Sequence, residues 1–198
     1  MGDADLVCLL QQQFPHPLIE QGTVDGIPTV WVDASHVGAL LRYCKHELQP
    51  SYAMLYDITA IDERVRSHRE GQPASDFTLI YQLLSLTGNA FVRIKVALMD
   101  SHLRVDTQCD VWPNANWYER ECHDMFGIDF VGHPNLYPLI IPPTWKGHPL
   151  RKEHPARATE MEPFSIDEQM QDEEQEALRF VPEQWGMQRE GKNTDYMF

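Results

Sequence analysis

Four residues in the second half of the sequence could serve as zinc ligands. Cys109 and Cys122 precede His148 and His154, and five residues separate the two histidines, a spacing found in zinc fingers. A structural zinc site usually takes its paired cysteines from positions about two to four residues apart, and these two lie much further apart along the chain. Packed thiols and His-Pro turns are therefore the favoured interpretation, and we predict no metal ligand in this chain.

Cys122 and His123 are the residue types of a nucleophile and its base. Neighbouring residues of a helix point about 100° apart, so these two cannot act on one another. Another histidine could in principle serve Cys122. That cysteine, however, falls on the apolar face of the predicted helix with Tyr118 and Met125, which favours a packed thiol. We predict no catalytic residue.

Two carboxylates, Glu119 and Glu121, lie close together in the same predicted helix. Because they are about 200° apart around the helix axis, they cannot converge on one substrate bond as an acid and base pair. They border the apolar stripe, while Arg120 and Asp124 have the i,i+4 spacing on the far side. Two interpretations stay open: a salt-bridged surface helix, or a charged edge set against a partner protein.

A basic cluster formed by Lys146, Arg151, Lys152 and Arg157 follows this helix. It fits a solvated run of charges or a docking strip equally well. The sequence contains no phosphate-binding glycine loop and no dinucleotide fingerprint after a strand. We therefore expect no cofactor and no active site in this chain.

The elements that would position these side chains follow from the hydrophobic pattern. The clearest is a hairpin over residues 76–99 around Thr87-Gly88-Asn89, because Gly and Asn accept the positive φ of a tight turn. Apolar and basic residues alternate along its second strand, which indicates a sheet with one wet face. The remaining pattern predicts helices at 3–14, 33–48 and 114–126, strands at 27–32 and 52–62, and a short edge strand at 102–105.

Together these elements predict the α+β fold class: a two-layer domain with a mostly antiparallel mixed sheet and helices on one face. We place this domain at residues 1–130. It includes the 114–126 helix, which begins near Pro113 and ends at Gly127 as its C-cap. An extended Pro-rich and His-rich C-terminal arm is expected at 131–160 and an acidic tail with a short helix at 161–198.

The arm is predicted from its prolines. Residues 132–155 hold six prolines and three His-Pro pairs, so they can form neither a helix nor a central strand. At about 3.1 Å per residue the segment could reach about 75 Å, whereas the rest of the chain would be only about 35–40 Å across. The arm is therefore long enough to leave its own domain and wrap another.

Charge and composition exclude several classes of partner. The chain of 198 residues has a formal net charge of −14 and no basic run long enough to bind a row of phosphates, so nucleic acid is a poor partner. Its first residues lack the basic region of a secretory signal, and no apolar run is long enough to span a membrane. Four cysteines without close pairs indicate reduced thiols. We expect a cytosolic protein, or one held to a membrane only through partners.

Two segments carry a resemblance to a known family. "NWYERECHDMFGIDFVGHPNL" at 116–136 and "WKGHPLRKEHPARAT" at 145–159 closely resemble the C subunit of the bacterial proton-translocating NADH:quinone oxidoreductase, complex I. The upstream "HREGQPASDF" is also similar, so the resemblance covers nearly the whole chain. Tyr137 departs from the pattern, because many members carry a basic residue there, so the charged contact of those members is not expected at this position.

The resemblance implies a non-catalytic structural component of the peripheral arm of that respiratory-chain translocase, on the cytoplasmic side of the inner membrane. Such a component supports the quinone-reducing module and holds no cofactor, while FMN and iron-sulfur clusters lie in other subunits. Its implied partners are the D, B and I subunits and other peripheral-arm subunits, with the membrane reached only through the complex. The residues expected at partner interfaces are Glu119, Arg120, Glu121, Asp124, His133, Pro134, Lys146, His148, Pro149 and Arg151.

The end of the chain, "EGKNTDYMF", resembles the start of the D subunit in bacteria where the C and D subunits are fused. We therefore expect this sequence to be the C portion of a fused C/D polypeptide. An alternative is the equivalent component of a related membrane-bound hydrogenase or formate-oxidising complex, where the same module meets a nickel-iron protein. A third possibility is a free-standing enzyme that uses Cys122.

Overall fold

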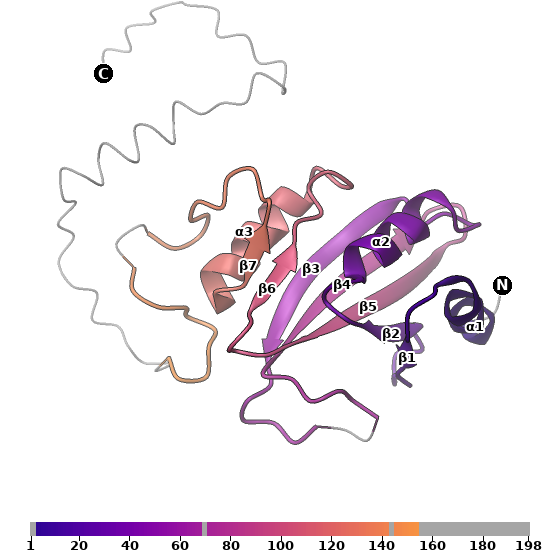
Figure 1. Cartoon of the computed structure of the whole chain (residues 1–198). Helices are drawn as coiled ribbons and strands as arrows, with labels where there is room; N and C mark the ends of the chain where they lie inside the picture. The colour runs from indigo at the N-terminus through magenta and orange to yellow at the C-terminus, as the bar shows by residue number, and fades with distance from the viewer. Residues whose placement is uncertain (1–2, 69–70, 143–144, 155–198) are drawn as a thin grey trace, which may run out of the picture. The chain divides into compact units, whose positions relative to one another are not determined.

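The computed structural model describes residues 3–68, 71–142 and 145–154 (Figure 1). These ranges all belong to one unit, Met1–Glu160. Arg157, the end of the predicted arm and the predicted acidic tail at 161–198 lie outside the described residues. None of the helices in the described ranges is long and apolar enough to cross a lipid bilayer.

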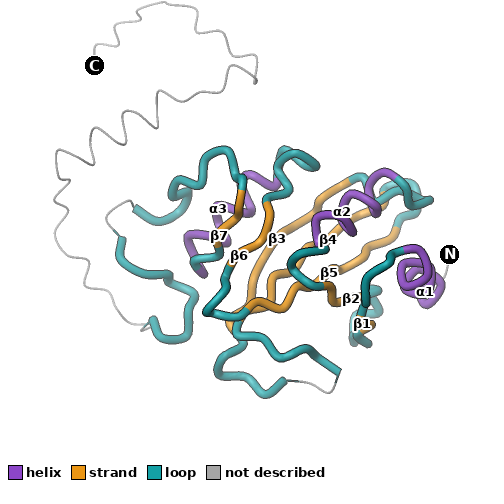
Figure 2. The backbone as a smooth tube through the Cα atoms, viewed as in Figure 1, coloured by secondary structure: helices purple, strands orange, loops and turns teal. Residues whose placement is uncertain are grey.

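The main sheet has five strands in the order β1-β2-β5-β4-β3, and Figure 2 shows its long strands side by side. Strand β2 pairs with β5 in parallel, and the other three pairings are antiparallel. This confirms the mostly antiparallel mixed sheet. The strands are β1 (Ile19–Glu20), β2 (Thr29–Val32), β3 (Met54–Asp62), β4 (Phe77–Ser85) and β5 (Ala90–Leu98).

The predicted hairpin is the pair β4 and β5. Tyr81 lies opposite Ile94, and both are fully buried on one face of the sheet, whereas their neighbours Ile80 and Lys95 point to the other, half-exposed face. A Cβ added to Gly88 in the connecting turn would lie 2.7 Å from Pro50 Cγ. Position 88 therefore needs a glycine because of the close approach of Pro50, whereas the positive φ of this turn, 46°, falls on Asn89.

Three helices share one core with the buried face of the sheet: α1 (Asp3–Gln13), α2 (Val37–His46) and α3 (Ala115–Phe126). Helix α2 buries residues at helical spacing, which is the amphipathic pattern of a helix packed on a sheet (Figure 1). It begins later than predicted, because Asp33 accepts hydrogen bonds from Ser35 in a turn instead of capping the helix. The buried residues of α2 are Val37, Leu40, Leu41 and Cys44.

A second, two-stranded sheet flanks α3. Strand β6 (Arg104–Asp106) pairs in parallel with β7 (Asp129–Val131), so β6, α3 and β7 form a strand-helix-strand crossover. The prediction that residues 102–105 add an edge to the main sheet was wrong, because the strand found there pairs with β7. The carboxyl ends of the two strands meet, with Asp106 opposite Val131.

Candidate functional site

Helix α3 and the loop before it cover the free edge of β3. Side chains of this segment donate hydrogen bonds to backbone carbonyl oxygens in and just before β3, so the edge strand does not offer these groups to another chain. Cys122 takes part through its thiol, and burial raises the pKa of that thiol well above its ordinary value. The packed-thiol interpretation of Cys122 is confirmed. The side chain of Trp112 donates to the backbone oxygen of Ala53, and in the same way Asn114 donates to Leu55, Tyr118 to Tyr56 and Cys122 to Ile58.

Glu119 lies in the interior and not at the exposed helix edge expected for it. Its side chain is 0% exposed and accepts hydrogen bonds from the Thr107 hydroxyl, the Gln108 N–H and the Cys109 thiol. Burial raises the pKa of Glu119 to about 7, although these hydrogen bonds oppose the shift. Glu121, on the other side of the helix, is exposed as expected.

Asp124 and Arg120 fasten the first part of the arm to α3. One carboxylate oxygen of Asp124, which is 1% exposed, accepts the backbone N–H groups of Leu139 and Ile140, each at 2.7 Å. The Arg120 guanidinium donates to the backbone oxygens of Tyr137 and Pro138 at 2.8 and 3.1 Å. Asp124 is therefore also an interior residue, and both side chains bind backbone of the same chain.

Three residues of the arm, His148, Leu150 and Arg151, cap the carboxyl end of α3. Arg151 Nε donates to the Phe126 oxygen at 2.7 Å, and the His148 ring contacts the Asp124 backbone oxygen at 2.9 Å. The Leu150 N–H donates to the Met125 oxygen at 3.1 Å. The last carbonyl groups of a helix have no hydrogen-bond donor within the helix, so these arm residues supply the missing donors.

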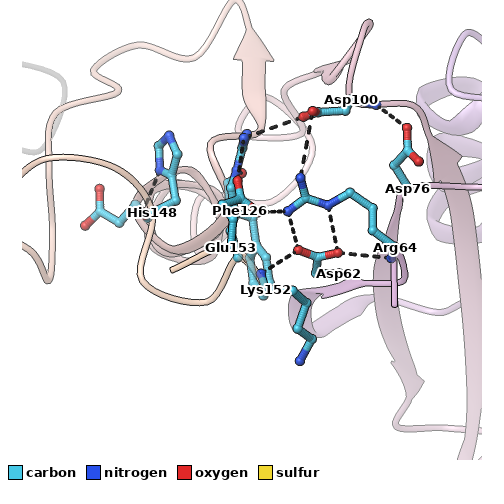
Figure 3. A network of polar contacts seen from close by, with 10 residues as sticks. Asp62, Arg64, Asp76, Asp100, Phe126, His148, Lys152 and Glu153 are labelled. Carbon is cyan, nitrogen blue, oxygen red and sulfur yellow. Dashed lines mark hydrogen bonds and ion pairs between the residues drawn. The ribbon is translucent and has the colours of Figure 1, made fainter. Parts of the chain in front are cut away.

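A network of charged groups holds the end of the arm to the end of β3 (Figure 3). Asp62 lies between Arg64 and the backbone of Lys152, and it accepts from Arg64 Nε at 3.0 Å and from the Lys152 N–H at 2.8 Å. Asp100 lies within 3.5 Å of Arg151, and Glu153 pairs with Arg64. Burial alone would raise the pKa of Asp62, but the bonds from Arg64 and Lys152 outweigh it and lower the pKa to about 2.

The predicted interface residues thus fall into three groups. Glu119 and Asp124 are interior, while Glu121, Pro134 and Lys146 are exposed. The other five are partly buried: Arg120, His133, Pro149, and also His148 and Arg151, which bind the end of α3.

The four zinc-finger candidates do not converge. Cys122 donates to the Ile58 oxygen, His148 contacts the end of α3, and His154 stacks on Trp145 with ring centroids 5.7 Å apart. Cys109 instead lies against Glu119.

The sequence did not single out Asp62, Arg64 or Asp100. Each contacts the arm across a long stretch of chain, and no local motif marks such a contact. The lone signal was the position of Asp62 and Arg64 at the end of a predicted strand.

Three large apolar side chains are exposed on α3 and on the anchored arm. Trp117 on α3 is 53% exposed and lies under the Arg120 guanidinium, 5.4 Å from the ring centroid. Ile140, in the segment that Asp124 holds, is 56% exposed, and Leu150 is also exposed. Aromatic side chains such as that of Trp117 are enriched where one protein contacts another.

Comparison with known proteins gives consistent results. Residues 30–160 match the model of the family described as "Respiratory-chain NADH dehydrogenase, 30 Kd subunit". The chain is 57% identical over 180 residues to the C/D subunit of the NADH-quinone oxidoreductase of Methylococcus capsulatus, covering 91% of this chain and 31% of that protein. It is 50% identical over 197 residues to the protein of the same name from Pseudomonas aeruginosa PAO1, covering 99% and 33%. The chain therefore spans about a third of the length of these relatives.

Two solved structures share the fold. One is described as "Nqo5 of the trypsin-resistant fragment (1-134) in P63 form", with a TM-score of 0.52 and 23% identity over 67% of this chain and 98% of that one. The other is a chain of the membrane-bound sulfane sulfur reductase, an archaeal respiratory membrane complex, with a TM-score of 0.61 and 20% identity over 83% and 96%. At these identities the likeness shows the fold alone.

Proposed function

The chain belongs to the respiratory-chain NADH dehydrogenase 30 Kd subunit family, and from that premise we propose that it is the C part of a proton-translocating NADH:quinone oxidoreductase. The observation that carries this proposal is the 57% identity, over 91% of the chain, to a protein named as the C/D subunit of an NADH-quinone oxidoreductase. The hydrogenase or formate-oxidising alternative is not favoured, because the relatives at 50–57% identity are named as subunits of an NADH-quinone oxidoreductase.

In this role the chain is a non-catalytic structural component of the peripheral arm, on the cytoplasmic side of the inner membrane. It supports the quinone-reducing module, while FMN and iron-sulfur clusters belong to other subunits. The structural support is the way the chain uses its charges. Glu119, Asp124, Arg120, Arg151 and Asp62 hold backbone or side chains of the same chain in place.

The D subunit is the proposed main partner, and the names of the relatives support its fusion to this chain. The proposed contact surface is the outer side of α3 and the arm. Its exposed residues include Trp117, Ile140, Leu150, Glu121 and Lys146. Because hydrogen bonds already fix the arm on α3, little further ordering is required when a partner binds. The B and I subunits are proposed as further neighbours of the same module.

The function is tested by purifying the complex that contains this chain from its host and assaying its activity. Purified complex containing the unchanged chain is expected to oxidise NADH and reduce quinone. A complex that contains the chain, lacks NADH oxidation and carries a nickel-iron protein would establish the alternative. A Cys122→Ala variant is expected to keep the activity of the complex, whereas a free-standing Cys122 enzyme would lose its own.

The contact surface is tested separately with Trp117→Ala and Ile140→Ala. Both changes remove exposed side chains, so the isolated chain should keep its stability while assembly with the D part weakens. The control is Val24→Ala, which alters a fully exposed apolar residue away from α3 and the arm. Native gels of the assembled complex measure the outcome, and equal assembly of all three variants would contradict this surface.

A further inference from the structure

Three side chains that can ligate metals meet where β6 and β7 end. Cys109 Sγ, a carboxylate oxygen of Glu119 and a ring nitrogen of His133 all lie within 4.8 Å of one another. Cys109 follows β6, His133 follows β7, and Glu119 projects from the helix that joins the two strands. The parallel pairing brings the carboxyl ends of both strands together, so the fold itself creates this meeting point.

We propose that Cys109, Glu119 and His133 form a binding site for one zinc ion. Zinc bonds of about 2.3 Å to sulfur and about 2.0 Å to oxygen, at a tetrahedral angle, place the two donor atoms about 3.5 Å apart. Cys109 Sγ and Glu119 Oε2 are 3.6 Å apart. One thiolate, one carboxylate and one neutral imidazole balance the charge of Zn²⁺ and leave a fourth position for water.

The ligand set selects the kind of metal. A thiolate with an imidazole suits zinc, whereas magnesium and calcium require oxygen ligands. At present the Cys109 thiol donates its hydrogen to Glu119. Zinc binding breaks the S–H bond of Cys109 and forms a zinc–sulfur bond, and the hydrogen leaves as a proton to solvent. This exchange needs no oxidant or reductant.

Groups around the ligands are arranged as supporting contacts. The Thr107 hydroxyl and the Gln108 N–H hold the Glu119 carboxylate in a fixed orientation. One His133 nitrogen, Nε2, lies 3.4 Å from the Asn116 backbone oxygen, a typical orienting partner for a zinc-bound histidine. Ligation through Nδ1 would keep this contact and replace the one from the Asn135 N–H at 3.0 Å.

The site is tested on the full 198-residue chain after treatment with a chelator. Titration with Co²⁺ is expected to give a thiolate-to-cobalt charge-transfer band that saturates at one ion per chain, and Zn²⁺ should displace it. Cys109→Ser should abolish the band, and His133→Ala should weaken zinc binding about tenfold or more. The matched controls are Cys8→Ser and His102→Ala, which alter exposed residues elsewhere and should leave both signals unchanged.

A measurement on the unmodified chain tests the site even if the variants fail to fold. Bound zinc should slow alkylation of Cys109 about tenfold or more, as followed by mass spectrometry, while the exposed Cys8 reacts at its metal-free rate. The proposal is overturned if no thiolate band forms, if the band survives in Cys109→Ser, or if zinc leaves the alkylation of Cys109 unchanged.

Discussion

At the scale of single residues, buried carboxylates position the arm. Asp124 accepts the N–H groups of Leu139 and Ile140, and Asp62 accepts that of Lys152, far along the chain. Hydrogen bonds to a charged group are about twice as strong as neutral ones, and leaving a buried partner unpaired costs more than the bond contributes. These two side chains should therefore govern how firmly the arm is held.

Asp124→Ala should lower the free energy of unfolding by about 2–3 kcal/mol, because it leaves the backbone N–H groups of residues 139–141 without their acceptor. Urea unfolding of the isolated chain measures the change, and hydrogen exchange at residues 139–141 should accelerate. The control is Glu121→Ala, an exposed carboxylate in the same helix, for which we expect a change within about 0.5 kcal/mol. Equal midpoints for the two variants would show that Asp124 does not anchor the arm.

Asp62 should make the stability of the chain sensitive to acid. Its folded-state pKa of about 2 is lower than the ordinary value of 3.8, so its stabilising effect is present above about pH 4 and disappears as the pH falls toward 2. Unfolding midpoints of the wild type should therefore fall more steeply over this range than those of Asp62→Asn. Asp110→Asn, which alters an exposed ion pair with Arg42, should follow the wild type. Parallel curves for the wild type and Asp62→Asn would contradict this role.

At the scale of elements, α3 shows what the sequence could and could not predict. Its range, 114–126, and its C-cap at Gly127 were predicted from capping signals, and the helix runs from Ala115 to Phe126 with Gly127 at φ 75°. A helix cap depends on a few neighbouring residues, so it can be predicted from a single sequence. The burial of Glu119 was missed, because the loop at 107–109 that it binds is brought there only by the β6 and β7 pairing.

Gly127→Ala tests the junction of α3 with the arm. An alanine there would adopt a strained left-handed conformation, and its Cβ would lie 2.5 Å from His148 Nε2 and 2.8 Å from the Arg151 guanidinium. We expect a loss of about 2–4 kcal/mol in unfolding free energy and faster hydrogen exchange at residues 148–152.

Gly132→Ala is the matched control. It has a similar φ of 80°, but its added Cβ would make only an ordinary contact of 3.6 Å with Thr107. The control should lose only the cost of the left-handed conformation, about 1–2 kcal/mol. If both variants lose the same amount, the steric conflict with His148 and Arg151 contributes nothing.

At the scale of the whole molecule, the sequence predicted the α+β class and left the path of the arm open. Prolines exclude a helix and a central strand, but an extended segment takes its hydrogen bonds from distant residues that no local pattern identifies. From its length, we expected the arm to be able to leave its own domain and wrap another. The described part of the arm instead contacts α3 and the end of β3 of its own chain. Any contact with the D subunit is proposed for the outer side of this part.

Truncation separates the domain from its arm. A chain that ends at residue 131 should still fold, because the buried hydrophobic core ends at Phe130. It should nevertheless be less stable than a chain that ends at 154, by about 2–4 kcal/mol, since Asp124, Asp62 and the last carbonyl groups of α3 lose their partners. Urea unfolding of both chains and hydrogen exchange in the last turn of α3 measure the difference. Equal stability would mean that the arm only rests on the domain. An unfolded 1–131 chain would mean that the arm is part of the folding unit.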